Sequence, residues 1–288
     1  MVYSSAFPRK AHYPPRLQGG KPPVITLLTD FGLEDVYVGV MKGIIAQIIP
    51  QAQVIDLSHE IPPQNIALGS FQLGTAYPHF PPGTIHVAVV DPGVGGTRRA
   101  IAVQTRSSLL VGPDNGLFSH VLMQDPAIAA VELTHSHYWY TVSPSSTFHG
   151  RDIFAPVAAH LATGCPLQNL GLGVDLSSLN LCSAIPPWQP TSTGGIGVIQ
   201  TIDHFGNLIT NIPAESVKNH AWSVQIGPCQ IPSAPSYCSL ENHPTWIALI
   251  GSHGWLEIAL PNGNAQQSLQ THLGTSVHLM LHPSPPTL

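Results

Sequence analysis

The sequence predicts an α/β fold: an N-terminal domain with a mostly parallel sheet flanked by helices, and a smaller C-terminal all-β, barrel-like domain. Before residue 183, short apolar runs of strand length alternate with segments of helical periodicity, as in parallel sheets with crossover helices. After a Pro/Ser-rich stretch at 184–192, short alternating runs separated by turns replace the helices. With 288 residues, the chain is long enough to build two cores.

The N-terminal elements follow one another in a regular order. We expect strands at 24–28, 53–57 and 84–90, with helices at 35–49 and 66–77 between them. Each strand then leads into a helix before the next strand begins. This order favours right-handed crossovers, and it brings the carboxyl ends of the three strands to one edge of the sheet.

The next part of the chain predicts two further strands, 100–104 and 108–111, before a turn at Gly112–Gly116. A helix is expected to run from Asp152 through Thr163. Asp35 and Asp152 are good N-cap types for the helices that they precede, because their carboxylates can accept from the first free amides.

The C-terminal domain is predicted to hold only short strands. Its alternating runs are 197–202, 221–226, 245–250, 255–260 and 276–281. We predict four segments along the chain. They are a basic, Pro-rich disordered tail at 1–22, the α/β domain at 23–183, a linker at 184–192 and the β domain at 193–288.

Composition excludes several classes of function. Net charge is −5, and four of the ten basic residues lie in the first 21 positions, so the body of the chain is too acidic for a nucleic-acid surface. No apolar run reaches the length of a membrane helix, and the N-terminus lacks the apolar region of a secretory signal, which predicts a cytoplasmic protein. The four cysteines lack C-x-x-C spacing and no H-E-x-x-H motif occurs, so we expect no metal site.

The stretch V-V-D-P-G-V-G-G-T-R-R, residues 89–99, is the most informative one in the chain. Asp91 lies at the carboxyl end of a buried strand, where open α/β sheets bind ligands. The glycine-rich loop after it lets backbone approach a ligand closely, and Arg98 adds a permanent cation. Taken alone, the stretch is equally consistent with a strand connection that carries a surface salt bridge.

Other polar residues lie in small-residue or apolar surroundings: Asp30, Asp35, His149, Asp203 and Asn207. Each has a structural alternative, because aspartates and asparagines shape turns and caps, and a histidine can lie at a helix start. The sequence has no G-x-S-x-G elbow, phosphate-binding loop or dinucleotide-binding fingerprint. The polar residues therefore indicate a site outside these familiar chemistries.

Five motifs, taken in order, resemble the S-adenosyl-L-methionine hydroxide adenosyltransferases, a family related to the S-adenosylmethionine-dependent fluorinase and chlorinase. They are T-D-F-G-x-x-D, V-V-D-P-G-V-G-x-x-R-R, G-P-D-N-G, T-F-H-G-R-D and D-x-F-G-N-x-x-T-N, and the resemblance runs from Val24 to Leu281. It implies an α/β domain followed by a β-barrel-like domain. It also implies a homotrimer whose active sites lie between subunits.

The resemblance implies hydrolysis of S-adenosyl-L-methionine to adenosine and L-methionine, by attack of water or hydroxide on the ribose C5′ carbon. In the hydroxide-using members an Asp-Arg-His set holds the nucleophile, and those positions fall on Asp91, Arg98 and His149. The sulfonium is already a good leaving group, so the work left to the enzyme is to orient water and exclude solvent. We therefore expect a metal-independent enzyme without a cofactor.

The resemblance also implies residues that bind the substrate. Asp30 matches the position that holds the ribose hydroxyls. The other implied contacts are Asp35 and Asp203 near the methionine amino group, Asn207 and Phe205 at adenine, Ser252 at the methionine carboxylate and Gln64 in the wall around the nucleophile. His253 and Gln64 depart from the fluorinase, which has arginine and tryptophan there.

Two other functions remain open at this point. A halogenase of the same family would use halide in place of water, but halogenating members lack the set found at Asp91, Arg98 and His149. A non-catalytic protein that binds S-adenosylmethionine or adenosine would need the ribose contact without that set. The presence of both favours the hydrolase.

Overall fold

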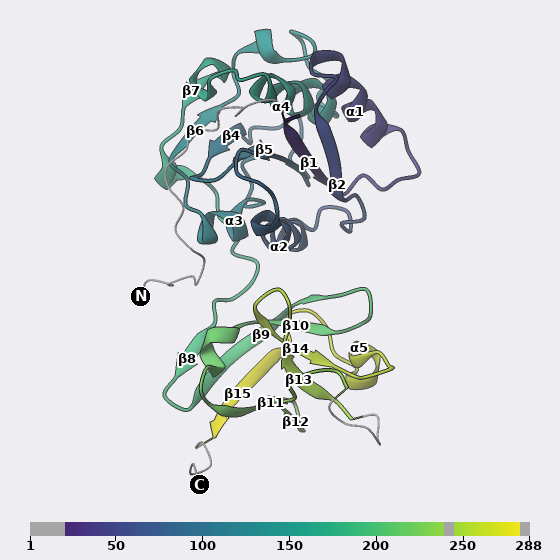
Figure 1. Cartoon of the computed structure of the whole chain (residues 1–288), viewed down its shortest axis with the longest axis vertical. Helices are drawn as coiled ribbons and strands as arrows, with labels where there is room; N and C mark the ends of the chain where they lie inside the picture. The colour runs from purple at the N-terminus through teal and green to yellow at the C-terminus, as the bar shows by residue number, and fades with distance from the viewer. Residues whose placement is uncertain (1–20, 239–244, 283–288) are drawn as a thin grey trace. The chain divides into compact units, whose positions relative to one another are not determined.

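The computed structural model describes residues 21–238 and 245–282, so nearly all of the predicted tail lies outside the described residues. The chain divides into two compact units, residues 1–182 and 183–288 (Figure 1). The segment predicted as a linker contains a short strand, β8 (Gln189–Thr191), which pairs with β9 (Gly194–Ile202). Within the described ranges, no helix has both the length and the apolar character that crossing a membrane requires.

The first unit is built on a seven-stranded sheet in the order β2-β1-β3-β5-β4-β6-β7. Its strands are β1 (Val24–Thr29), β2 (Gln53–Ser58), β3 (Ile85–Val89), β4 (Ala100–Gln104), β5 (Leu109–Pro113), β6 (Ala129–Glu132) and β7 (Leu172–Gly173). Strands β2, β1, β3 and β5 pair in parallel, whereas β5, β4, β6 and β7 pair antiparallel. The sheet is mixed, and the prediction of a mostly parallel sheet is confirmed only for its first half.

The connection between β4 and β5 explains the change of direction. Only residues 105–108 join the two strands, too few for the crossover that a parallel pair requires. The Thr105 hydroxyl closes this turn by accepting from the amides of Ser107 and Ser108. A hairpin is therefore the only arrangement that these two strands can adopt within the sheet.

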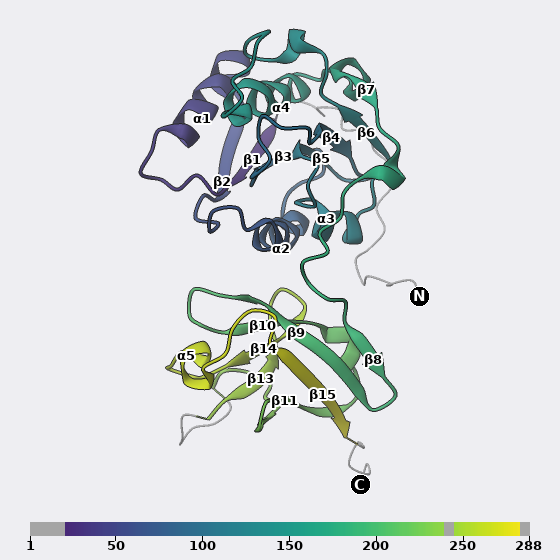
Figure 2. The same cartoon turned by 180° about the vertical axis from the view of Figure 1, so that it is seen from behind.

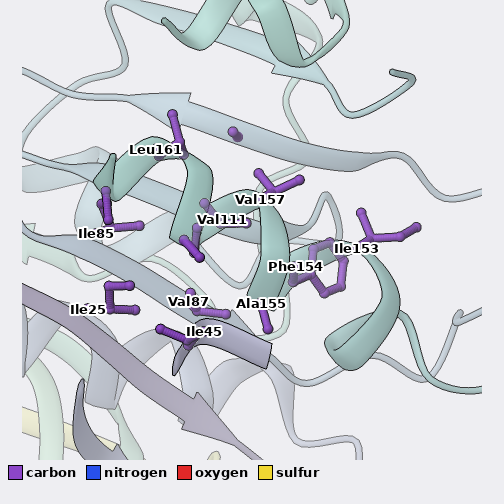
Figure 3. Packing of buried hydrophobic residues seen from close by; sticks show 14 of the residues in the cluster. Ile25, Ile45, Ile85, Val87, Val111, Ile153, Phe154, Ala155, Val157 and Leu161 are labelled. Atoms are coloured by element: carbon purple, nitrogen blue, oxygen red, sulfur yellow. The ribbon is translucent and has the colours of Figure 1, made fainter. Parts of the chain in front are cut away.

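Helices cover both faces of this sheet (Figures 1 and 2). Helices α1 (Tyr37–Ile48) and α4 (Ala155–Ala162) lie on one face, and α2 (Ile66–Ala76) and α3 (Ser119–Gln124) lie on the other. Successive strand residues alternate between the two resulting cores, since side chains of a strand point to opposite faces. Figure 3 shows the first core, in which α4 packs on β1, β3 and β5.

Two helix starts differ from the prediction. Helix α1 begins at Tyr37 with Val36 at the N-cap position, so the exposed Asp35 does not cap it. A π-helical turn, Gly150–Phe154, precedes α4, and Asp152 lies fully buried inside it. The Asp152 carboxylate pairs with Arg151 and accepts from the Ser145 amide, so it ties a loop to the turn instead of capping a helix.

The second unit is an antiparallel, nearly closed barrel in the order β12-β11-β15-β9-β10-β14-β13. Its remaining strands are β10 (Leu208–Pro213), β11 (Ala221–Ile226), β12 (Cys229–Pro232), β13 (Ile247–Ile250), β14 (Trp255–Ala259) and β15 (Ser276–His282), and α5 (Ala265–Leu269) is its only α-helix among the described residues. A bridge between Ser233 and Ala248 joins the two end strands. The predicted barrel-like architecture is confirmed, although strands β8, β10 and β12 are missing from the prediction.

Candidate active site

Two acidic residues lie at one edge of the first sheet. Strands β1 and β3 are parallel neighbours, and Thr29 at the end of β1 pairs with Val89 at the end of β3. Asp30 follows Thr29 directly, and Asp91 comes two residues after Val89. The two carboxylates therefore leave the sheet at its carboxyl edge, as parallel pairing predicts.

Asp91 and Arg98 form a forked ion pair. The Arg98 Nε lies 3.0 Å from each carboxylate oxygen of Asp91, and Nη2 also donates to Oδ2. The side chains are 5% and 12% exposed, so water screens the pair little. The guanidinium lies over the Phe154 ring at 5.5 Å, which fixes its plane. The structure thus joins the predicted residues Asp91 and Arg98 in one ion pair that is largely shielded from solvent.

His149 completes this group. Its Nδ1 lies 2.7 Å from Arg98 Nη2. A guanidinium only donates, so Nδ1 accepts and the neutral imidazole carries its proton on Nε2. Partial burial lowers the pKa of His149 below 6.5, and the charge of Arg98 lowers it further. His149 is therefore neutral near pH 7 and presents a hydrogen-bond donor at Nε2.

The loops that carry these three residues contact each other through backbone. Gly95 has φ +74°, and a Cβ there would lie 2.2 Å from the Ser146 carbonyl oxygen. Only glycine fits such an approach. The π-helical turn that begins at Gly150 then sets the position of His149, and π-turns are common at functional sites.

Asp30 holds the segment that contains Gln64. Its Oδ2 accepts from the Gln64 amide at 2.8 Å. Gln64 has φ +67°, a left-handed conformation that costs a non-glycine residue energy unless its surroundings hold it. Both side chains are at least partly exposed, so Asp30 keeps an oxygen available to a ligand. Asp35 is exposed on the loop between Asp30 and α1.

In the second unit, Asp203 and Asn207 form one turn. The carboxylate of Asp203 accepts from the amides of Phe205 and Asn207, and also from Asn207 Nδ2 at 2.9 Å. Asn207 is buried, whereas the Phe205 ring is 71% exposed. An exposed aromatic ring on an ordered turn offers a flat surface on which a base can stack.

Ser252 is exposed in the turn between β13 and β14, and the neighbouring His253 turns inward. His253 Nδ1 accepts from the Trp255 amide, and its Nε2 lies 3.2 Å from Glu257 Oε2. Tyr237 donates to the other oxygen of Glu257. Burial raises the pKa of Glu257, but these two partners outweigh it and leave the pKa below its ordinary value. The structure therefore gives His253 a role in holding this turn.

Several residues next to these groups are absent from the sequence-based prediction. Asn115 Nδ2 donates to the Val90 carbonyl and so fixes the end of β3. The rings of Phe31, Tyr37 and Phe148 stack edge-to-face between the Asp30 turn and the His149 loop. The motifs T-D-F-G and T-F-H-G contain two of these aromatic residues, so spacing could have indicated them. Within the described residues, no three His, Cys, Asp or Glu side chains gather as a metal site would require.

Comparison with protein families shows what the chain is similar to. Residues 25–171 match the model described as the SAM hydroxide adenosyltransferase N-terminal domain, and residues 197–278 match the corresponding C-terminal domain. A Thermus thermophilus protein named (R)-S-adenosyl-L-methionine hydrolase is 38% identical over 89% of this chain and 99% of its own length. A fluorinase of Actinopolyspora mzabensis is more distant, at 25% identity over 82% of this chain and 90% of its own.

Solved structures show the same fold. A Thermotoga maritima protein described as an uncharacterized conserved protein superposes with a TM-score of 0.83 and is 35% identical. The match covers 89% of this chain and 99% of the other. The likeness therefore extends through both units.

Proposed function

Since the chain belongs to the SAM hydroxide adenosyltransferase family, we propose that it hydrolyses S-adenosyl-L-methionine to adenosine and L-methionine. The observation that supports this most directly is the contact of Asp91, Arg98 and His149 at the carboxyl edge of the sheet. The Thermus thermophilus relative is named (R)-S-adenosyl-L-methionine hydrolase, and we propose the same substrate for this chain. No cofactor or metal is part of the proposal.

The proposed step is an in-line displacement. The water oxygen forms a bond to C5′ while the C5′–S bond breaks and its electron pair goes to sulfur, which leaves as methionine. The sulfonium loses its positive charge, so the leaving group needs no acid. The protein has to hold water in line and keep bulk solvent away.

We propose a different task for each side chain of this group. His149 Nε2–H donates to the water oxygen, because Nδ1 already accepts from Arg98. Asp91 is the group that accepts the proton of the attacking water, and the proton then passes to solvent. Arg98 holds both partners through its hydrogen bonds to Asp91 and His149. Positioned polar groups of this kind contribute most to catalysis when they need no rearrangement.

The remaining side chains are proposed to bind the substrate. Asp30 takes the ribose hydroxyls with its partly exposed carboxylate, and Gln64 forms part of the wall beside the nucleophile. In the second unit, Phe205 stacks on adenine and Asn207 reads its edge. Asp203 and Asp35 lie near the methionine amino group, and Ser252 contacts the carboxylate.

Isotope labelling tests the displacement. Turnover in oxygen-18 water should place the label in adenosine and none in methionine, because the new bond forms at C5′. EDTA should leave the rate almost unchanged. Label in homoserine, or loss of activity with the chelator, would contradict the proposal.

The same assay with added chloride or fluoride separates the hydrolase from a halogenase. Halide should give no 5′-halogenated nucleoside, because the Asp91 carboxylate repels an anion that must also lose its hydration. Mass spectrometry of the products at high salt measures this. A 5′-chloro- or 5′-fluoro-5′-deoxyadenosine product would favour the halogenase.

The pH profile should depend on His149. Protonation at Nδ1 would place a proton and a positive charge against Arg98, so the active form is neutral. Activity should therefore be constant above the pKa of His149 and fall about tenfold per pH unit below it. Because burial and then Arg98 lower this pKa, the midpoint should lie below 6.5. Activity in kcat/KM that falls as the pH rises through the pKa of His149 would show instead that His149 acts in its charged form.

We further propose that the protein assembles as a homotrimer in which each site takes residues from two subunits. Each subunit carries the proposed catalytic group in its first unit and the proposed adenine contacts in its second. Co-expressed His149→Ala and Asp203→Ala chains, each inactive alone, should recover about one quarter of wild-type activity by random assembly. No recovery in mixed trimers, or a monomer by light scattering, would refute shared sites.

A further inference from the structure

A buried histidine lies directly behind the Asp30 turn. His59 follows β2 and is 3% exposed, and its Nδ1 lies 2.8 Å from the hydroxyl oxygen of Thr29. Thr29 is fully buried and immediately precedes Asp30. The histidine is therefore separated from the proposed ribose ligand by a single side chain.

The Thr29 hydroxyl contacts two neighbours. Its oxygen accepts from the Phe31 amide at 3.2 Å and also lies within hydrogen-bond distance of His59 Nδ1. The His59 carbonyl also accepts from the Gly32 amide at 2.8 Å. His59 thus holds the Asp30 turn at a side chain on one flank and at the backbone on the other.

The other side of the imidazole is held less closely. Its Nε2 lies 3.1 Å from Asp56 Oδ1, but the direction falls short of a hydrogen bond. The Asp56 side chain is 38% exposed and pairs with Lys42 at 2.6 Å. Of the two ring nitrogens, Nδ1 makes the contact that fixes the ring.

We propose that His59 is a positioning residue: through Thr29 it sets the place of the Asp30 carboxylate, and so the grip on the ribose. The inference rests on the proposed function, because it takes Asp30 as the ribose ligand. A displacement of a binding group by a fraction of an ångström weakens binding strongly, whereas a buried histidine that only fills space would affect stability alone.

The same sheet contains a matched control. His86 on β3 is fully buried, and its Nδ1 lies 2.8 Å from the Thr26 hydroxyl. Thr26 and Thr29 both belong to β1. Thr26 is three residues before Thr29, in the interior of β1 and away from the Asp30 turn. The two pairs share chemistry and burial and differ in their distance along β1 from Asp30.

Substitutions separate the two ring nitrogens of His59. In His59→Asn the amide oxygen lies near the position of Nδ1, so this variant keeps the contact to Thr29. In His59→Gln the amide lies near the position of Nε2, so this variant loses the contact to Thr29. Adenosine dissociation constants by calorimetry should rise about tenfold or more for His59→Gln and stay within about threefold for His59→Asn and His86→Gln. KM should rise more than kcat falls, since ribose contacts exist in ground and transition states. The melting temperature should be lowered for both His59→Gln and His86→Gln.

Two further variants test the proposal independently of His59→Gln alone. Thr29→Val removes the same hydroxyl contact and should also weaken adenosine binding, which gives a second route if His59→Gln does not fold. In an Asp30→Ala background, His59→Gln should have no additional effect on affinity. Unchanged affinity in folded His59→Gln and Thr29→Val, or an equal loss in His86→Gln, would overturn the inference. Wild-type protein that binds neither adenosine nor S-adenosylmethionine would instead refute the proposed function.

Discussion

Arg98→Ala and His149→Ala should each lower kcat by about 10²–10⁴, the range expected when oriented polar assistance to a nucleophile is lost. Both side chains are proposed to act on the attacking water and not on the substrate. Their loss should therefore change the affinity for S-adenosylmethionine by less than about tenfold. Single-turnover kinetics and calorimetry on the same samples measure the two quantities separately.

The adjacent Arg99 provides the control for this experiment. Arg99 pairs with the buried carboxylate of Asp114 and donates to Ser178, so it ties loops together within the first unit. Arg99→Lys keeps the charge beside Asp114 and should lower the melting temperature while kcat stays near that of wild type. Normal turnover by the Arg98 and His149 variants would make the cluster structural and would reopen the non-catalytic interpretation.

Asp30→Asn should raise the dissociation constant of adenosine by about 10²-fold, because two charge-assisted hydrogen bonds to the ribose are lost. Asparagine keeps an oxygen that can accept from the Gln64 amide, so the local fold is retained. A nucleoside without the 2′- and 3′-hydroxyls identifies the contact. Wild type should bind 2′,3′-dideoxyadenosine as poorly as the variant binds adenosine, and the variant should hardly distinguish the two nucleosides.

Calorimetry with the two nucleosides and two proteins gives the complete cycle. The coupling between Asp30 and the hydroxyls should account for most of the loss. If the variant still prefers adenosine over the dideoxynucleoside by the wild-type factor, Asp30 does not hold the ribose. Glu215→Gln, which removes the acidic partner of an exposed ion pair with Lys218 in the second unit, is a suitable charge control with little expected effect.

The sequence was sufficient to predict the parts of the fold that depend on local pattern. Apolar runs followed by helical periodicity predicted β1, β2 and β3 with their helices, and the acids at the strand ends predicted which edge of the sheet carries polar groups. The α/β fold class and the helices that flank the first sheet follow from the same pattern. What placed Asp91, Arg98 and His149 together was the family resemblance, since residues 51 positions apart carry no spacing signal.

The remaining features depend on contacts that no local pattern contains. Asp152 has the residue type of a cap, but a neighbouring arginine and the Ser145 amide compete for its carboxylate and win. The hairpin at β4 and β5 is an exception, because the predicted strands 100–104 and 108–111 already leave too few residues between them for a parallel crossover. His59 resembles any other buried histidine until its distance to Thr29 is known.

The contact between Gly95 and the Ser146 carbonyl has a consequence for redesign. Because the two loops touch through backbone, neither can be exchanged alone without moving the other. An attempt to change the nucleophile that this scaffold accepts should therefore transplant 91–99 and 145–150 as one block. Point substitutions within either loop change the side chains but keep the distance between the two loops. That distance depends on both loops together, so it is retained only when both are transferred.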